Sequence, residues 1–172
     1  MKHRIFILSL VILLSACSSS KMLAEHYLDY DSAIEIGYEQ LPERARLFHD
    51  ICHVPNDIKE IYAGLQMNNG KKGYEITFSN GGRMLLDHNG NYLMMENERN
   101  CLPPCWTNQI PVYHTMYMTI ANDHKKSTKP WIISRLEVYP RRYIVRVNVG
   151  EEYEDYTFDK KGKFVASIMA ID

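Results

Sequence analysis

The chain has 172 residues, of which 24% are charged and 45% are hydrophobic, and its formal net charge at pH 7 is −1. A chain of this length can bury one real core, or form two small units that share a core. Because acidic and basic residues nearly balance, the composition gives no reason to expect nucleic acid as a partner.

The first residues follow the order of a bacterial lipoprotein signal. Lys2 and Arg4 give a basic start, residues 5–14 form an almost unbroken apolar run, and residues 14–17, LSAC, resemble a lipobox. The apolar run is too short to cross a bilayer as a helix, so we interpret residues 1–16 as a cleaved signal. We expect acylation of Cys17 to attach the protein to the membrane, with the periplasmic side of the outer membrane as its predicted location. An ordinary secretory signal with an incidental cysteine is the alternative.

Residues 17–40 are predicted to be a tether, with a short extended segment or a helical turn where Ile34, Ile36 and Tyr38 alternate. The first clear element then begins at Leu41-Pro42, since proline suits the first helical position. An apolar stripe at helical spacing follows and predicts a helix that ends before Pro55. The stripe consists of Leu47, Phe48, Ile51 and Cys52.

Four strands are predicted after this helix, at residues 58–67, 74–79, 83–87 and 91–95. Apolar and polar residues alternate in them, and turns rich in Asn and Gly separate them. The turn at Asn80-Gly81-Gly82 is a strong hairpin signal, because Gly and Asn tolerate positive φ.

The same order of elements returns 69 residues later, where Ile110-Pro111 repeats Leu41-Pro42. The second helix is expected to carry its own apolar stripe of Tyr113, Met116, Tyr117, Ile120 and Ala121. Four further strands are predicted at residues 131–139, 143–150, 153–159 and 163–169. The domain prediction is therefore a first repeat at 41–95, a linker at 96–108 and a second repeat at 109–172.

Hairpin connections make neighbouring strands antiparallel, and a sheet with one polar face needs cover on the other face only. We therefore predict an α+β fold in which each repeat has a helix plus a four-stranded antiparallel sheet, with the helices on one face. Tyr143, Val145, Val147 and Val149 are expected to face the helices, as are Met84, Leu86, Tyr156 and Phe158. The opposite, open face is the predicted binding surface and carries Glu75, Thr77, Arg83, Ile144, Arg146, Asn148, Asp155 and Thr157.

This succession of motifs resembles the PepSY-like proteins, secreted and lipoprotein members of the beta-lactamase-inhibitor-like (BLIP-like) group that is frequent in Bacteroidetes. The resemblance rests on Leu-Pro at the start of a helix, a proline at its end, YEITF and GGRMLLDxxG, followed by a second, looser copy. It implies a tandem α+β fold with helices on one face of a curved antiparallel sheet, and it implies no enzyme activity. The inhibitor in the group's name reflects a relationship of fold and does not establish a target.

Three cysteines remain if Cys17 is acylated. Cys52 is interpreted as a small core residue, and Cys101 and Cys105 as the natural disulfide pair in an oxidising compartment. Free thiols or a pairing with Cys52 are the alternatives. A redox site is disfavoured, because the C-x3-C spacing lacks the two-residue spacing of a thioredoxin-type site.

His49 and His53 lie four residues apart on the predicted first helix and make a metal pair conceivable. Exposed helix histidines are the preferred interpretation, since H-D-I-C-H does not match a metalloprotease motif. Asp87 to Asn91 looks a little like a calcium loop, but its counterpart from Asp159 to Lys163 has lysines at the ligand positions, which favours a shared β-turn. We predict no metal and no cofactor.

The sequence thus predicts a non-catalytic, lipid-anchored envelope protein that binds an unidentified envelope protein or peptide, with enzyme inhibition as one form of that role. The alternative is a structural lipoprotein of outer-membrane assembly, similar to the SmpA/OmlA type.

Overall fold

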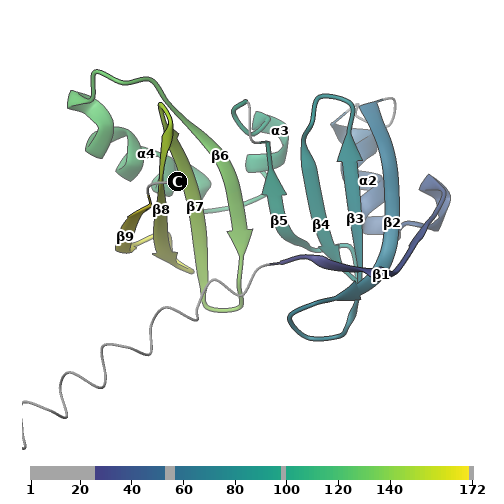
Figure 1. Cartoon of the computed structure of the whole chain (residues 1–172). Coiled ribbons are helices and arrows are strands. Elements are labelled where there is room, and N and C mark those ends of the chain that lie inside the picture. Colours follow the sequence, from purple (N-terminus) through teal and green to yellow (C-terminus); the bar gives the residue numbers. More distant parts are fainter. Residues whose placement is uncertain (1–25, 53–56, 98–99, 171–172) are drawn as a thin grey trace, which may run out of the picture.

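The computed structural model of the protein describes residues 26–52, 57–97 and 100–170. All nine strands join one antiparallel sheet in which each strand pairs with the next along the chain (Figure 1). The strands are β1 (Leu28–Glu35), β2 (Ile58–Gln66), β3 (Lys72–Phe78), β4 (Arg83–Asp87), β5 (Tyr92–Glu96), β6 (Trp131–Val138), β7 (Arg142–Val149), β8 (Glu152–Asp159) and β9 (Phe164–Ala170).

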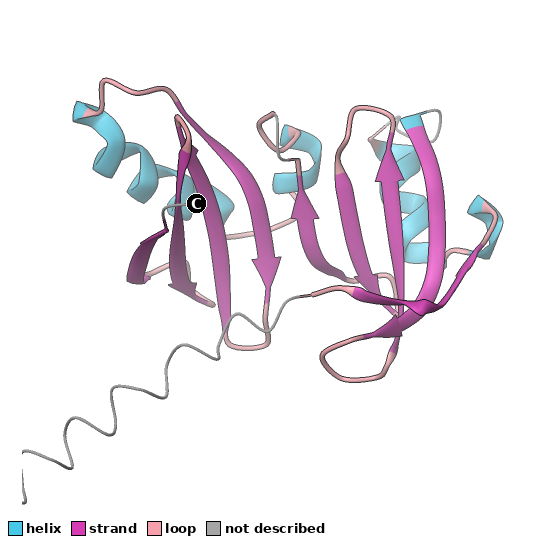
Figure 2. Ribbon diagram, viewed as in Figure 1, coloured by secondary structure: helices cyan, strands magenta, loops and turns pink. Residues whose placement is uncertain are grey.

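The helices lie on one side of this sheet (Figure 2). α2 (Glu43–Ile51) lies behind the half that contains β3 and β4, α3 (Pro104–Thr107) lies beside β5, and α4 (Tyr113–Asp123) lies behind β7 and β8. Two 3-10 turns complete the described elements, at Tyr38–Gln40 and His124–Lys126. The protein is therefore a mixed α+β protein dominated by one open sheet. No helix in the described part of the chain is long and apolar enough to cross a membrane.

The main core fills the space between the helices and the sheet, and the predicted alternation of β7 is confirmed. Tyr143, Val145 and Val147 are buried in this core, with Val149 packed against it. Met84 and Leu86 of β4, and Tyr156 and Phe158 of β8, are also core residues as expected. The period of two in these strands is enough to assign their faces, because successive side chains point to opposite sides of a sheet.

The predicted stripe of α2 is only partly correct. Ala45, Phe48 and His49 are buried, whereas Leu47 is 54% exposed. Met116, the residue at the position of Leu47 under the 69-residue offset, is completely buried. The two helices therefore present different positions to the sheet, because packing against the sheet rather than the local apolar pattern sets their rotation.

Two predicted connecting segments contain structure. β1 lies inside the predicted tether of residues 17–40 and pairs with β2, with an irregular register between Asp29 and Ile34. The predicted linker of residues 96–108 contains α3, and Trp106 of that helix is 1% exposed. The tether was expected to hold at most a short extended segment or a helical turn. Both segments have strand or helix contacts with residues far away in sequence, which their local patterns do not indicate. Residues 1–25, and with them Cys17, lie outside the described residues.

The two Asp-x-x-Gly turns have the same geometry and the same position. The Asp87 carboxylate accepts hydrogen bonds from the backbone N–H of Asn89 and Asn91, at 2.8 and 2.9 Å. Asp159 accepts the corresponding bonds from Lys161 and Lys163, at 2.8 and 2.9 Å. Burial acts to raise the pKa of the Asp87 carboxyl. The hydrogen bonds from the Asn91 side chain and from these two backbone N–H groups outweigh burial, so the pKa is lowered.

Each turn also packs against the start of a helix, which explains its glycine. Gly90 has a φ of +81°, and a Cβ at that position would lie 3.1 Å from the backbone N of Ala45 in α2. Gly162 has a φ of +78°, and a Cβ there would lie 3.1 Å from Cβ of Val112, the residue before α4. Both a positive φ and close approach therefore require glycine at these two positions.

His49 is completely buried, which corrects the prediction of an exposed helix histidine. Its ring packs against Phe48 and Phe78, and neither of its ring nitrogens has a hydrogen-bond partner among the described residues. Burial lowers the pKa of His49 to about 4, against a smaller opposing effect of Asp50. Burial, assisted by the positive charge of Arg135, also lowers the pKa of His26 to about 4.

These two histidines predict a pH-dependent stability. In the unfolded chain they gain protons below about pH 6.5, whereas in the folded protein they stay neutral down to about pH 4. Their contribution to the free energy of unfolding is therefore present above about pH 6.5 and is lost as the pH falls towards 4. Between pH 7 and pH 5, each histidine is expected to lower the free energy of unfolding by about 2 kcal/mol.

Urea unfolding at a series of pH values measures this effect. His49→Leu is expected to remove about half of the loss in unfolding free energy between pH 7 and pH 5. The control is His88→Gln in an exposed turn, which is expected to keep the wild-type profile. A His49→Leu profile as steep as that of the wild type would contradict the assignment.

Candidate functional site

The eight predicted open-face residues lie on the face of the sheet opposite the helices, but that face is not fully open. Glu75, Ile144 and Asp155 are 1%, 6% and 8% exposed. The segment of residues 26–30, which leads into β1 and forms its first part, crosses this face (Figure 1). Within it, Leu28 packs with Leu85 and Met94 in a second small core. Not all eight residues are accessible: Glu75 is covered by Tyr30 from the predicted tether, and Asp155 is paired with Arg146.

Aromatic side chains of this segment contact the charges beneath them. The ring of Tyr27 lies 5.0 Å from the guanidinium of Arg83 and 5.8 Å from that of Arg135. The hydroxyl of Tyr30 donates a hydrogen bond to Glu75. The ring of His26 packs on Tyr139 at 4.5 Å between centroids. The segment is thus held by cation–π and hydrogen-bond contacts as well as by its apolar side chains.

Beneath the segment, acidic and basic side chains alternate across four strands. Arg83 of β4 lies 2.6 Å from Glu96 of β5 and 3.9 Å from Glu75 of β3. Arg135 of β6 lies 3.4 Å from Glu96 and 2.8 Å from Glu137. We call these five residues the charge ladder. The ladder bridges β5 and β6, and the sequence did not single out Glu96, Arg135 or Glu137.

The remaining predicted open-face residues form local contacts on the same sheet. Arg146 makes a bidentate pair with Asp155, with both distances 2.8 Å, and its guanidinium lies 4.0 Å from the centroid of the Tyr153 ring. Asn148 accepts a hydrogen bond from Ser134 at 2.8 Å. Thr77 and Arg83 line a polar hollow of about 540 Å³. The predicted residues thus fall into small separate groups and do not make one continuous site.

An apolar hollow lies on the helix side, and the sequence did not predict it. It has a volume of about 550 Å³ and lies between α3, α4 and the start of β6. We call it the groove. Its described lining contains no Asp, Glu, Lys or Arg; its apolar and aromatic members are Leu102, Pro104, Ile110, Pro111, Tyr113, Tyr117, Trp131, Ile132 and Ile133. The Cys101, Thr107, Asn108 and His114 side chains complete it.

The groove exists because β5 and β6 separate. Their pairing is limited to the three residue pairs from Met94–Glu137 to Glu96–Arg135. Beyond these pairs, the backbone N–H of Asn97 donates to the carbonyl of Ser134 at 2.7 Å, and that of Leu102 donates to Ile133 at 3.0 Å. The chain then turns away into α3, which leaves the first residues of β6 as part of the groove lining.

A row of rings runs along this site. Tyr113 and Tyr117 of α4 are 6.4 Å apart between ring centroids, and Tyr117 is 5.9 Å from Trp131 of β6. Trp131 in turn stacks on His124 at 5.5 Å. Burial raises the pKa of Tyr113 to about 12, so this phenol is neutral in the physiological range. The site therefore offers flat, uncharged surfaces that suit apolar and aromatic groups.

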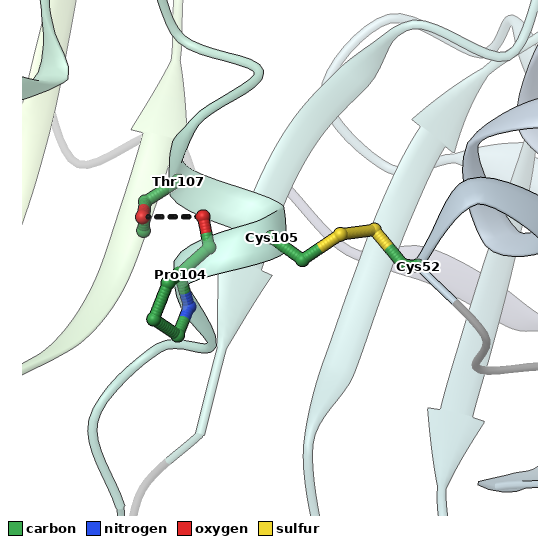
Figure 3. The surroundings of a disulfide bond; sticks show 4 residues. All are labelled: Cys52, Pro104, Cys105 and Thr107. Atoms are coloured by element: carbon green, nitrogen blue, oxygen red, sulfur yellow. Dashed lines mark hydrogen bonds between the residues drawn. A yellow bond between two sulfur atoms is a disulfide. The ribbon is translucent and has the colours of Figure 1, made fainter.

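A disulfide lies between α2 and α3 (Figure 3) and corrects the predicted pairing. Cys105 is bonded to Cys52 at the end of α2, with a Cα–Cα distance of 5.9 Å and a sequence separation of 53. Cys101 is a free, exposed cysteine that lines the groove. The predicted Cys101–Cys105 bond was wrong, because the position of α3 beside the end of α2 decides the pairing.

No group of three or more His, Cys, Asp or Glu side chains suited to a metal ion occurs among the described residues. His49 is enclosed by aromatic rings, and its predicted partner His53 lies outside the described residues. The Asp87 carboxylate, which the sequence suggested as a calcium ligand, accepts hydrogen bonds from the backbone N–H groups of its own turn.

No protein-family model and no curated protein matches the chain. Solved structures from Bacteroides do. A protein of Bacteroides thetaiotaomicron described as calcium-regulated and periplasmic is 18% identical, with a TM-score of 0.60 over 81% of this chain and 98% of the other. A periplasmic protein of the DUF2874 family from Bacteroides vulgatus is 17% identical, with a TM-score of 0.64 over 80% and 98%.

A BLIP-like protein from Bacteroides fragilis also matches, with 17% identity over 79% of this chain and 91% of the other. Its TM-score of 0.30 is too low to support an argument about this chain. At these identities the neighbours establish the fold alone. The chain therefore has the fold of periplasmic Bacteroides proteins, in line with its sequence resemblance to secreted proteins of Bacteroidetes.

Proposed function

We propose that the protein is a non-catalytic binding module of the periplasm, and that its groove holds an extended, apolar segment of an envelope protein or peptide. The observation that carries this proposal is the groove itself, with its row of rings and its uncharged lining. Its volume of about 550 Å³ is within the usual range of ligand sites, roughly 300 to 1,000 Å³.

The backbone of β6 supports an extended ligand in particular. The pairing of β6 with β5 stops at Arg135. Beyond it, Leu102 makes a backbone hydrogen bond to Ile133, which lies on the way to Trp131 at the start of β6. A strand whose edge is only partly covered can accept another extended segment, with neighbouring pockets taking its alternate side chains. An apolar segment fits here, because the described lining offers no charged side chain to pair with a ligand charge.

The periplasmic location is supported by the signal-like N-terminus and by the descriptions of the neighbours in the two Bacteroides species. Acyl chains on Cys17 would anchor such a protein to the membrane. The short distance in sequence from Cys17 to β1 would keep the sheet close to the membrane surface.

We also propose that residues 41–95 and 109–172 descend from one duplicated, PepSY-like unit. The support is the matched pair of Asp-x-x-Gly turns, each packed against the start of a helix. Each helix then covers its own half of the sheet.

Selection of displayed short peptides on the purified protein tests the binding proposal. The enriched sequences are expected to share apolar and aromatic residues. Their affinity, measured by fluorescence anisotropy, is expected to fall about tenfold or more in Tyr117→Asp, because a carboxylate in an apolar groove loses its hydration.

Met118→Asp is the matched control. Met118 is 45% exposed and Tyr117 is 40% exposed, but only Tyr117 lines the groove. The Met118→Asp protein is expected to bind the selected peptides as the wild type does. Selection without an apolar consensus, or equal losses of affinity in both variants, would contradict the assignment of the groove.

A further inference from the structure

The last strand of the sheet is unusually apolar for an edge strand. β9 pairs with β8, and no second neighbour lies beside it among the described residues. Its sequence, FVASIMA, contains no charged residue and no proline. Phe164, Val165, Ile168 and Met169 are 42%, 61%, 69% and 62% exposed. Edge strands usually carry charge, proline or a bulge that blocks pairing with another chain.

The register shows that β9 is apolar on both faces of the sheet. Phe164 is opposite Phe158, and its ring lies 6.1 Å from the rings of both Phe158 and Tyr156. Phe164 therefore continues the helix-side core to the edge of the sheet. Ile168 is opposite Asp155 and so lies on the other face. Apolar side chains on both faces are unexpected for an edge strand in contact with water. They are typical of a strand that is covered on both faces.

The opposite edge of the sheet is built differently. β1 carries Asp29, Asp31 and Glu35, and its pairing with β2 is irregular between Asp29 and Ile34. These acidic side chains and the irregularity are features that discourage pairing in register, even though Ile34 is itself exposed. The register of β9 with β8 also shifts, between Thr157 and Phe158. The two edges therefore differ in charge: β1 carries acidic side chains, whereas β9 carries no charged side chain.

We propose that β9 pairs antiparallel with β9 of a second copy of this chain, so that the two sheets become one. A twofold axis perpendicular to the sheet places the two strands antiparallel and keeps the helices of both copies on the same face. The pairing is isologous and closes on itself, whereas β9 against β1 would leave free edges and grow into a filament. Because residues 164–170 are uncharged, the two copies meet without like charges. This inference does not depend on the groove.

Sedimentation velocity over a range of protein concentrations tests the proposal. Cys101→Ser is included in every sample, so that the free cysteine cannot link two copies. The protein is expected to show a monomer–dimer equilibrium, and Ile168→Lys and Met169→Lys, on opposite faces of β9, are each expected to weaken dimerisation about tenfold or more. Hydrogen exchange of the β9 amides is expected to slow as the protein concentration rises.

Met67→Lys is the matched control, because Met67 and Ile168 are both 69% exposed and Met67 lies just after β2. This variant is expected to dimerise as the parent does. Circular dichroism confirms that each variant is folded. Three results would overturn the proposal: a monomer at about 100 µM, a dimer that tolerates both lysines in β9, or open-ended assemblies that indicate pairing of β9 with β1.

Discussion

Replacing Cys52 with serine is expected to lower the free energy of unfolding by about 4 kcal/mol. The disulfide to Cys105 joins residues that are 53 positions apart, and the chain-entropy model gives about 4 kcal/mol for a closed loop of this length at 25 °C. The bond also holds α3, with its buried Trp106, beside the end of α2. Urea unfolding followed by circular dichroism, with the protein kept oxidised, measures the change.

Cys101→Ser is the control for this experiment, because Cys101 is free and exposed. It is expected to change the unfolding free energy by less than about 0.5 kcal/mol. Reduction of the wild-type protein is expected to reproduce most of the effect of Cys52→Ser. If Cys101→Ser proved as destabilising as Cys52→Ser, the Cys101–Cys105 pairing considered from the sequence would be supported instead.

Arg135→Ala is expected to cost about 3 kcal/mol of unfolding free energy, because it leaves the buried carboxylate of Glu137 without its ion-pair partner and leaves Glu96 with Arg83 alone. The Arg135 side chain is 7% exposed, and those of Glu96 and Glu137 are 10% and 4% exposed. The guanidinium also lies against the ring of Tyr27, so the segment before β1 is expected to loosen. Urea unfolding measures the loss, and hydrogen exchange at residues 26–30 reports the loosening.

The matched control is Lys129→Ala, which removes an exposed ion pair. Lys129 lies 3.1 Å from Glu152, and these side chains are 57% and 38% exposed. Ion pairs of this kind contribute about 0 to 1 kcal/mol. If Arg135→Ala and Lys129→Ala lowered the free energy of unfolding by similar small amounts, the charge ladder would not be what holds β5 and β6 together.

Much of the sheet could be predicted from the sequence, because its signals are local. The alternation of apolar and polar residues in β7 identifies the core face directly, and the glycine turns mark where strands end. The Asp-x-x-Gly turns at Asp87 and Asp159 were also recognised as β-turns from their residues alone. In each case the deciding interactions connect residues only a few positions apart.

The candidate site was less predictable, because it depends on contacts between distant segments. The groove combines α3, α4 and the start of β6, and no motif connects these three stretches in the sequence. The closest signal was the aromatic and apolar content of residues 110–117 and 131–133. That content is equally typical of core packing, so it could not identify an open hollow.

The extent of β1 in the predicted tether could not be predicted from the sequence, for a related reason. Residues 28–35, LDYDSAIE, have weak alternation and three acidic side chains, which is typical of a solvated tether. They form a strand because β2 offers an edge, and the preceding residues are held by the charge ladder and by a small apolar cluster. Local propensity is outweighed here by tertiary contacts.

By itself, the sequence determined the positions of α2, α4 and most strands, and the core faces of β4, β7 and β8. Those features follow from periodicity and turn chemistry, which act over a few residues. Only the tertiary structure decided that Cys52 pairs with Cys105, that β1 and the residues before it partly close the polar face, and that β5 and β6 separate to form the groove. These features depend on which distant surfaces meet, and such contacts are settled by the packing of the whole core.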